Sequence, residues 1–288
     1  MDKSNVCIVG LGLLGGSYAM ALSRKGHTVT AIDRDPAAIA YGLDRGLIQK
    51  GATADYAPLL QAAGLVVLCL YPHSILPWLS ENQNLLSPGC LLTDVCGVKG
   101  GIVAEAQALL RRDVEFVPAH PMAGRERLGV QNADCAIFAP ANFIITPTPA
   151  NTPAAIARIE ALAWELGFAR VVQLSPEEHD AIIGYVSQLT HAIAVSLMLA
   201  NDDPRLPLFT GDSFRDLTRI ARIDETLWSE LFLHNRDALL QQIDRFSAAL
   251  AQLREQVAAE NEAGLKAMFR ISSQRRSWLN QPQQPGSR

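Results

Sequence analysis

This sequence has little charge and no arrangement of cysteines that would suit a metal. Charged residues make up 19% of its 288 positions, and the formal net charge is −4 at pH 7. Because basic residues are not in excess, we expect no general surface for nucleic acid, and an anionic ligand would need a local cluster of arginines. The five cysteines form no C-x-x-C pair and no spacing pattern with histidine, so we expect no metal site.

The sequence also shows no pattern that is typical of a targeting segment or of a membrane-spanning helix. Residues 1–4 lead directly into an apolar strand pattern, and no uninterrupted apolar run approaches the length of a transmembrane helix. An odd number of cysteines is then compatible with a reducing compartment. We therefore expect a cytoplasmic protein that binds no membrane and is long enough for two domains.

Short apolar runs alternate with helical patterns over residues 5–174, which is typical of a doubly wound α/β domain with a mostly parallel sheet. The run at 65–70 is apolar throughout, as expected for a parallel strand covered on both faces. We expect strands at 6–9, 28–32, 65–70, 90–93, 115–117, 142–146 and 170–174, and helices at 15–25, 37–45 and 153–166.

The pattern after residue 174 is helical. Residues 175–178 (Ser-Pro-Glu-Glu) form a capping box with proline at the first helical position. Beyond a break at 204–207, residues 213–216 (Ser-Phe-Arg-Asp) predict that Ser213 opens a second helix. The expected organisation is a first domain at 1–174, an all-helical domain at 175–280 and a disordered tail at 281–288.

An apolar stripe at helical spacing follows in the same region. Such a stripe predicts core packing or a dimer surface, and the two can coexist. The stripe consists of Leu239, Ile243, Phe246, Leu250, Leu253 and Val257.

The segment Gly10-Leu11-Gly12-Leu13-Leu14-Gly15 follows the first predicted strand directly and opens a helix. In that context G-x-G-x-x-G is the fingerprint of a Rossmann-like dinucleotide-binding domain. Gly10 allows the tight turn, Gly12 lets pyrophosphate approach the backbone, and Gly15 lets the helix pack on the strand. The helix N-terminus supplies N–H groups and partial positive charge for the phosphates.

An acidic residue, Asp33, ends the second predicted strand about 20 residues later, where it would accept from the ribose 2′-hydroxyl and repel a 2′-phosphate. The sequence therefore predicts NAD, although Arg34 and Arg24 keep NADP open. A Rossmann-like domain without nicotinamide is a further alternative. The residues expected to contact the cofactor are Gly10, Gly12, Leu13, Leu14, Gly15, Asp33 and Arg34.

Two further segments, 93–99 (TDVCGVK) and 118–126 (PAHPMAGRE), fall where predicted strands end. Parallel α/β sheets bind ligands beyond the carboxyl ends of their strands, so His120 is well placed for chemistry, with a structural histidine as the alternative.

Two helical patterns also carry polar side chains that suit a site. Arg215 and Arg219 lie one helical turn apart and suit a carboxylate, or they belong to a solvated face with an Asp216–Arg219 pair. The first capped helix carries a polar and small stripe of Asp180, Gly184, Ser187, Gln188 and His191.

Taken together, the motifs GLGLLGGS, TDVCGVK, AHPMAGRE, SQLTH and SFRDLTRIA, with Trp228 following, resemble the prephenate/arogenate dehydrogenase family of tyrosine biosynthesis. The resemblance runs in order from Val6 to about Arg270. It implies a Rossmann-like domain followed by an all-helical dimerisation domain, a homodimer, and a site between the domains. It also implies NAD-dependent oxidative decarboxylation of prephenate to 4-hydroxyphenylpyruvate.

The resemblance carries roles over to particular residues. It implies that His120 accepts the proton of the substrate hydroxyl, and that Arg219 binds a substrate carboxylate with Asp216 orienting it. The further substrate contacts that it implies are Arg215, Ser187, Gln188, His191, Glu126 and Trp228.

The chain departs from the family pattern at two positions. Gly97 stands where the family usually has a serine that orients the catalytic histidine, so another group must hold His120 or the bond is missing. Gln188 stands where the family often has histidine, and a neutral amide can hydrogen-bond the substrate but carries no charge.

Two questions of function stay open from the sequence. Ser187, Gln188 and His191 offer no carboxylate for the ammonium of arogenate, which favours prephenate, although Asp180 lies nearby. Arogenate (cyclohexadienyl) dehydrogenase therefore remains an alternative, and a non-catalytic NAD-sensing protein is a more distant one. A β-hydroxyacid dehydrogenase would use a helical lysine, and the chain has none between Lys99 and Lys266.

Overall fold

The computed structural model describes residues 3–124 and 127–280 of the chain. The chain divides into two compact units, Met1–Leu239 and Leu240–Arg288, which are described separately.

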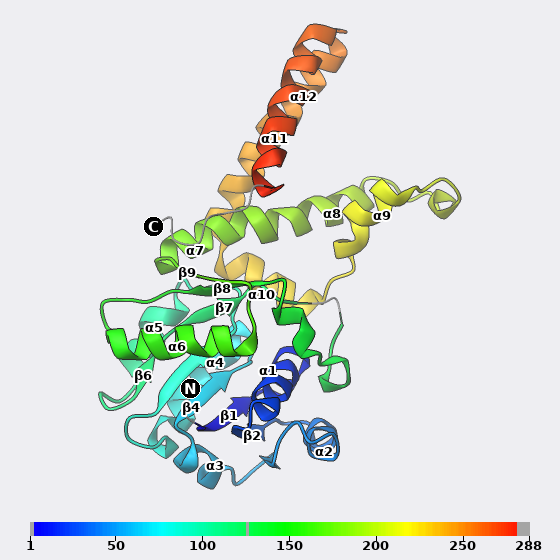
Figure 1. Ribbon diagram of the computed structural model, residues 1–288. Helices are drawn as coiled ribbons and strands as arrows, with labels where there is room; N and C mark the ends of the chain where they lie inside the picture. The colour runs from blue at the N-terminus through cyan, green and yellow to red at the C-terminus, as the bar shows by residue number, and fades with distance from the viewer. Residues whose placement is uncertain (1–2, 125–126, 281–288) are drawn as a thin grey trace. The chain divides into compact units, whose positions relative to one another are not determined.

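A six-stranded parallel sheet runs through the first unit in the order β3-β2-β1-β4-β5-β6 (Figure 1). The order reverses between β1 and β4, and such a switch point leaves a ligand crevice at the carboxyl ends of the strands. The predicted Rossmann-like fold is thus confirmed. The strands are β1 (Asn5–Val9), β2 (Thr28–Ile32), β3 (Lys50–Ala52), β4 (Leu65–Leu68), β5 (Leu91–Asp94) and β6 (Glu115–Phe116).

Both faces of this sheet are covered at its centre, which is why β4 is apolar and buried throughout. In β1, Val6 and Ile8 pack into one hydrophobic cluster, whereas Cys7 and Val9 pack into another. Successive side chains of a strand point to opposite faces, so each face has its own core. The helices of this region are α1 (Leu13–Arg24), α2 (Pro36–Asp44), α3 (Ala57–Ala62), α4 (Pro72–Asn82), α5 (Ile102–Leu109) and α6 (Pro153–Leu166).

A second, three-stranded sheet has the order β7-β8-β9. The strands predicted at 142–146 and 170–174 are present as β8 (Asn142–Ile145) and β9 (Arg170–Gln173). They lie in this second sheet, where β8 pairs with β9 on one side and with β7 (Ala119–Pro121) on the other. Because β7 is only three residues long and ends in proline, it has no alternating pattern that the sequence could reveal. This strand carries His120.

A long helix follows β9 through α7 (Pro176–Ile183), a π-helical turn (Gly184–Gln188) and α8 (Leu189–Leu199). The predicted capping box is confirmed, because Ser175 Oγ accepts from the backbone N–H of Glu178 and the Glu178 carboxylate accepts from Ser175 N. The span Pro176–Leu199 is long and apolar enough to pass as a membrane span, with a mean hydropathy of 1.6, contrary to the expectation. The likeness is one of length and composition, which the core helix of a soluble protein shares.

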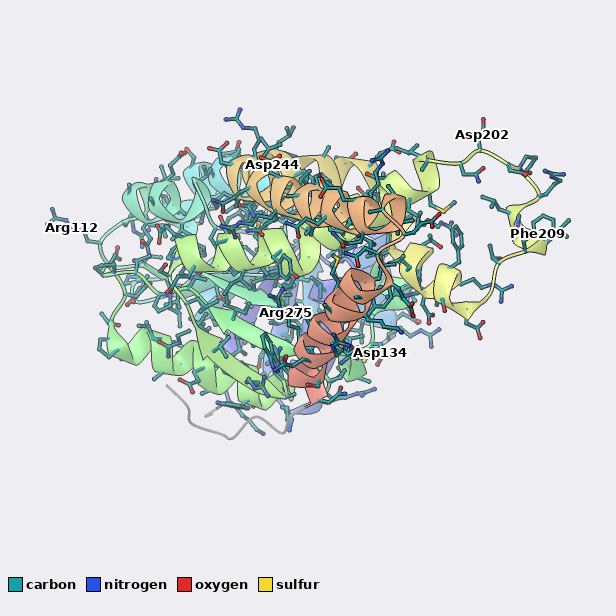
Figure 2. The ribbon with its side chains drawn as sticks, turned by 90° about the horizontal axis from the view of Figure 1, so that it is seen from above. Arg112, Asp134, Asp202, Phe209, Asp244 and Arg275 are labelled. Carbon is teal, nitrogen blue, oxygen red and sulfur yellow. The ribbon has the colours of Figure 1, made fainter. Side chains whose placement is uncertain are left out.

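A loop connects α8 to α9 (Asp212–Thr218), and Figure 2 shows Asp202 and Phe209 on it. Leu208 and Phe209 are 78% and 74% exposed there. The prediction that Ser213 caps α9 is wrong, because Gly211 is the N-cap and no side chain caps the helix. A 3-10 turn (Arg219–Ala221) and α10 (Glu225–His234) follow, with Asp224 capping α10 through Leu227 N.

The remaining helices are α11 (Arg236–Ala258), which begins in the first unit, and α12 (Glu262–Ser277). Among the described residues of the second unit, large apolar side chains lie on the surface of the single chain. The predicted stripe is therefore split: Leu239 in the first unit is 4% exposed, whereas Leu250 and Val257 are 53% and 59% exposed.

Candidate active site

The glycine loop between β1 and α1 is shaped by two contacts that only glycine permits. Gly10 has a φ of +92°, and a Cβ there would lie 2.3 Å from the carbonyl oxygen of Cys69. A Cβ on Gly15 would lie 2.0 Å from the carbonyl oxygen of Gly10. A Cβ on Gly12 would meet nothing within 4 Å, so open space remains beside the start of α1.

The first turn of α1 suits a phosphate. Gly12 is the N-cap and no side chain caps the helix, so the helix itself supplies no acceptor for the N–H groups of Leu13 and Leu14. Free N–H groups and the positive end of the helix dipole both attract anions. The loop therefore fits the pyrophosphate of a dinucleotide.

Asp33 follows β2 and is fixed beside this loop. Its Oδ2 accepts from the backbone N–H of Leu11 at 2.5 Å, and its Oδ1 accepts from Asp35 N at 2.8 Å. The carboxylate stays partly exposed, with exposed Arg34 next to it. An acid in this position suits a ribose hydroxyl rather than a 2′-phosphate.

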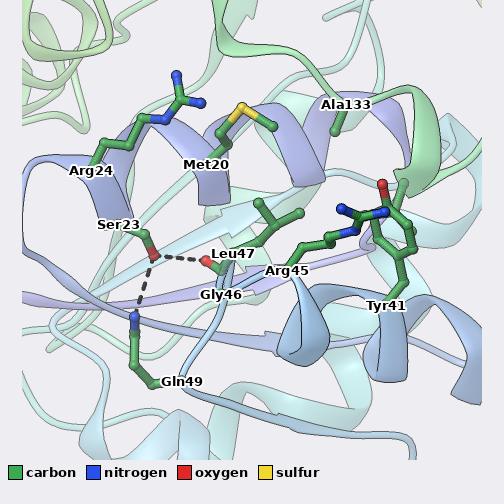
Figure 3. A pocket seen from close by; sticks show the side chains of 10 residues that line it. Met20, Ser23, Arg24, Tyr41, Arg45, Gly46, Leu47, Gln49 and Ala133 are labelled. Carbon is green, nitrogen blue, oxygen red and sulfur yellow. Dashed lines mark hydrogen bonds between the residues drawn. The ribbon is translucent and has the colours of Figure 1, made fainter.

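Arg24, in contrast, lies at the far end of α1, about 18 Å away along a 12-residue helix. Its Nη1 donates to Sγ of Cys135 at 3.1 Å. It lines a separate pocket of about 430 Å³ together with Ser23, Arg45 and Gln49 (Figure 3). Arg24 is therefore remote from the glycine loop and does not support NADP.

His120 on β7 is held from one side by a chain of polar side chains. Its Nδ1 lies 2.9 Å from Nε2 of His179, and Nδ1 of His179 lies 2.7 Å from Oδ1 of Asp180. Both partners are buried at the start of the long helix that follows β9. The carboxylate of Asp180 also accepts from the backbone N–H groups of Lys99, at 2.9 Å, and Gly100, at 2.6 Å.

A buried ion pair fixes the strand that carries His120. Lys99 Nζ donates to Oδ2 of Asp94 at 2.6 Å and to the carbonyl oxygen of Ala119 at 2.7 Å. Oδ1 of Asp94 accepts from Ala119 N at 2.9 Å. Lys99 and Asp94 are each 1% exposed, so the pair is shielded from solvent. Two side chains of the motif TDVCGVK, those of Asp94 and Lys99, thus hydrogen-bond the backbone of Ala119, the residue directly before His120.

This surrounding keeps His120 neutral. Burial, His179 and the Lys99 ammonium together hold the pKa of His120 well below its ordinary value. Burial also lowers the pKa of His179, against the opposing effect of the Asp180 carboxylate. Both imidazoles are therefore uncharged at neutral pH, and His120 has a lone pair for a proton.

Gly97 faces the other ring nitrogen of His120. A Cβ at Gly97 would lie 3.7 Å from Nε2 of His120 and 3.3 Å from Cδ2 of Leu231 on α10. The hydrogen bond that the sequence left open is thus made on the opposite side of the ring, by His179. Three residues before Leu231 on α10, Trp228 stacks on His191 of α8 with a centroid distance of 3.6 Å.

The three predicted residues of the long helix have different surroundings. His191 Nδ1 donates to the carbonyl oxygen of Ser187 at 2.9 Å, and both residues are partly exposed. Gln188 is 1% exposed; its Nε2 donates to Leu231 O and its Oε1 accepts from Asn235 Nδ2. The geometry gives Gln188 a part in helix packing, with both ends of its amide already bound.

The two arginines predicted to bind the substrate, Arg215 and Arg219, are both exposed. Arg215 on α9 is 64% exposed in its side chain and lies 3.6 Å from the Asp212 carboxylate. Arg219 is exposed and starts the 3-10 turn, which packs against α8, the helix of His191. Glu126 lies outside the described residues.

Sequence reasoning missed the contributions of Lys99, Asp94 and His179, and it named Asp180 only as a nearby acid in a polar stripe. The motif TDVCGVK was noted without an assignment, and His179-Asp180 directly follows the capping box. Their partners are far away in the chain, so only the fold reveals them.

The fold and these residues define a class, the dinucleotide-dependent dehydrogenases that join a Rossmann-like domain to a helical one. A family model described as "Prephenate dehydrogenase, nucleotide-binding domain" matches residues 18–173, and one described as "Prephenate dehydrogenase, dimerization domain" matches residues 175–271. The chain belongs to the prephenate dehydrogenase family.

The named proteins to which the chain is similar are dehydrogenases of the same kind. The chain is 28% identical to a prephenate dehydrogenase of Bacillus subtilis, over 96% of this chain and 76% of that one. It is 30% identical to a cyclohexadienyl dehydrogenase of Zymomonas mobilis, over 94% of each. A crystal structure of the Aquifex aeolicus prephenate dehydrogenase, in complex with hydroxyphenyl propionate and NAD⁺, superposes with a TM-score of 0.88 at 29% identity, covering 97% and 99% of the two chains.

Proposed function

We propose that this chain is an NAD-dependent dehydrogenase that converts prephenate to 4-hydroxyphenylpyruvate and CO₂ in tyrosine biosynthesis. One observation carries the proposal: α10 joins the parts of the site. Its Leu231 lies beside Gly97 and the free side of His120, and its Trp228 stacks on His191 one helical turn earlier. The proton acceptor His120 and the stacked pair of Trp228 and His191, which would line the substrate pocket, therefore lie beside the same helix, α10.

The cofactor site has the residues that NAD requires. The backbone of Gly12, Leu13 and Leu14 would bind the pyrophosphate, and Asp33 would accept from the adenosine ribose. Bound NAD would take the hydride that leaves C4 of the substrate ring. Asp33 disfavours the extra phosphate of NADP.

His120 is the proposed catalytic base. Its Nε2 accepts the proton of the C4 hydroxyl as the carbonyl forms, and its low pKa keeps this atom unprotonated beforehand. The electron pair of the ring C–CO₂⁻ bond then enters the ring as CO₂ leaves, which makes the ring aromatic.

Arg219 is proposed to bind a substrate carboxylate through its planar guanidinium, with Arg215 adding positive potential. Trp228 is proposed to wall the pocket, and Ser187 and His191 to contact the pyruvyl side chain. We leave Gln188 out of this set because both ends of its amide are bound within the protein.

Prephenate is favoured over arogenate by the placement of Asp180. The ammonium of arogenate needs a carboxylate partner, but Asp180 is already bound by His179 and by two backbone N–H groups. No other acid lies next to Ser187 or His191 in the sequence of the long helix. The relative named cyclohexadienyl dehydrogenase keeps arogenate as the alternative substrate.

The test is NADH formation at 340 nm with prephenate and then with arogenate, each with NAD and with NADP. We expect turnover with prephenate and NAD, and a kcat/KM at least tenfold lower with arogenate or NADP. Activity with neither substrate would contradict the proposal and favour a protein that binds NAD without catalysis.

We further propose a cytoplasmic homodimer with domains at 1–174 and 175–280. The exposed apolar side chains of the second unit, among them Phe269 at 57% and Ile271 at 50%, suit burial against a second copy. The description of the matching dimerization domain supports the same assembly. Light scattering after gel filtration should give twice the 31.2 kDa chain mass, and a monomer at micromolar concentration argues against it.

A further inference from the structure

We propose that His179 and Asp180 are positioning residues that fix the tautomer of His120, so that its Nε2 is the atom that takes the substrate proton. The inference rests on the proposed function for its chemistry. Its evidence is the hydrogen-bond chain from Asp180 through His179 to His120.

The chain begins at a carboxylate whose place is fixed by the backbone. Asp180 accepts from Lys99 N and Gly100 N as well as from His179, so its oxygens point in set directions. Side-chain burial is complete at His179 and nearly so at Asp180, with 0% and 11% exposure. Water therefore does not compete effectively for these bonds, and each keeps its strength.

The direction of every bond follows from chemistry. An ionised carboxylate only accepts, so Nδ1 of His179 must carry the proton. Since burial keeps His179 neutral, its Nε2 is then a lone pair and must accept from Nδ1 of His120. His120 is left with a lone pair on Nε2, which faces Gly97 and Leu231.

The same chain stabilises the product of proton transfer. When the O–H bond of the substrate breaks and the Nε2–H bond forms, His120 becomes an imidazolium. Its Nδ1–H bond to His179 then becomes charge-assisted, with the Asp180 carboxylate behind it. No other proton has to move. As the ring C–CO₂⁻ bond breaks and its electron pair makes the ring aromatic, the phenolate oxygen takes the proton back from Nε2 of His120, which returns the base to its neutral form. A third group that orients a catalytic histidine in this way is a known device in hydrolases.

The variant Asp180→Asn tests the proposal most sharply. An amide can donate a hydrogen bond to Nδ1 of His179. Both imidazoles would then change to the other tautomer, which places the proton of His120 on its Nε2. We expect kcat to fall about 10²- to 10⁴-fold, while KM for prephenate and Kd for NAD change less than threefold. His179→Gln keeps an acceptor for His120 and should lose less kcat than His179→Leu.

A matched control separates positioning from stability. His27 is another buried histidine, 4% exposed, with a carboxylate partner, Glu165, at 2.9 Å from its Nε2. It lies at the end of α1 away from the glycine loop. His27→Gln should lower Tm about as much as His179→Gln and leave kcat unchanged.

A second measurement does not depend on the substrate. Nitrogen chemical shifts of the histidine rings report the tautomer directly, with the His120 signals assigned by the His120→Asn variant. We expect the Nδ1–H form in the native protein and the Nε2–H form in Asp180→Asn. An Nε2–H form in the native protein, or a kcat of Asp180→Asn within threefold of native, overturns the proposal. If the native protein turns over neither substrate but has the expected tautomer, only the proposed function fails.

Discussion

The two ends of the candidate site are held in opposite ways. Around His120 the protein has a buried ion pair, a second histidine and a carboxylate bound by backbone N–H groups. Around Arg219 it has a short helix, a 3-10 turn and exposed side chains. Groups that transfer a proton gain from being fixed in advance, whereas a long cationic side chain can follow a carboxylate. We therefore expect changes at the buried end to alter kcat or stability, and changes at the exposed end to alter KM.

The largest effect should follow loss of the base. In His120→Asn the side chain can still hydrogen-bond but has no basic nitrogen, so kcat should fall at least 10²- to 10⁴-fold. Kd for NAD should stay within about threefold, because no residue of the glycine loop changes. NADH formation and NAD titration measure the two quantities, and a retained kcat would remove His120 from the chemistry.

The second effect is on stability. Lys99→Met leaves the Asp94 carboxylate buried without its partner, which should cost about 3–5 kcal/mol of unfolding free energy. Lys266→Met removes an exposed pair with Glu262 and should cost only about 0.3–0.5 kcal/mol. Urea denaturation of both variants measures these two losses of unfolding free energy. Equal losses would contradict the claim that the buried pair of Lys99 and Asp94 stabilises the region around His120.

A smaller effect is expected at the exposed end. Arg219→Gln removes a charge-assisted contact to the substrate, so KM for prephenate should rise about tenfold or more while kcat and Tm change little. Arg112→Gln, just before β6 at the amino ends of the strands, is a suitable control with unchanged KM (Figure 2). Arg219 would lose its assigned role if the two variants had the same KM.

The smallest effect concerns pH. The pKa values of His120 and His179 are lowered in the folded protein, so below the ordinary value of 6.5 the unfolded chain binds more protons than the folded one. These two groups therefore contribute stability above pH 6.5 that is lost as the pH falls. We expect Tm to decrease from pH 7.5 to 5.5 and to decrease less in His179→Gln. An equal or steeper decrease in that variant is the contrary result.

Local patterns were enough to predict most of the Rossmann-like region. Strand Thr28–Ile32 and helix Pro153–Leu166 match their predicted bounds, because apolar periodicity and caps act within a few residues. The capping box at Ser175 was predictable for the same reason.

The connections around His120 were not predictable in this way. His120 and His179 are 59 residues apart, and Lys99 and Asp180 are 81 apart. The burial of Gln188 likewise depends on Leu231 and Asn235, which belong to later helices. No pattern along one helix reports such partners, so Gln188 was predicted as a substrate contact.

The most direct test is a crystal structure of this protein with NAD and 3-(4-hydroxyphenyl)propionate. We predict the phenol oxygen at hydrogen-bond distance, about 2.6–3.2 Å, from Nε2 of His120, with the ligand carboxylate on Arg219. A phenol oxygen bound elsewhere, with Nε2 of His120 facing only protein atoms, would contradict the account.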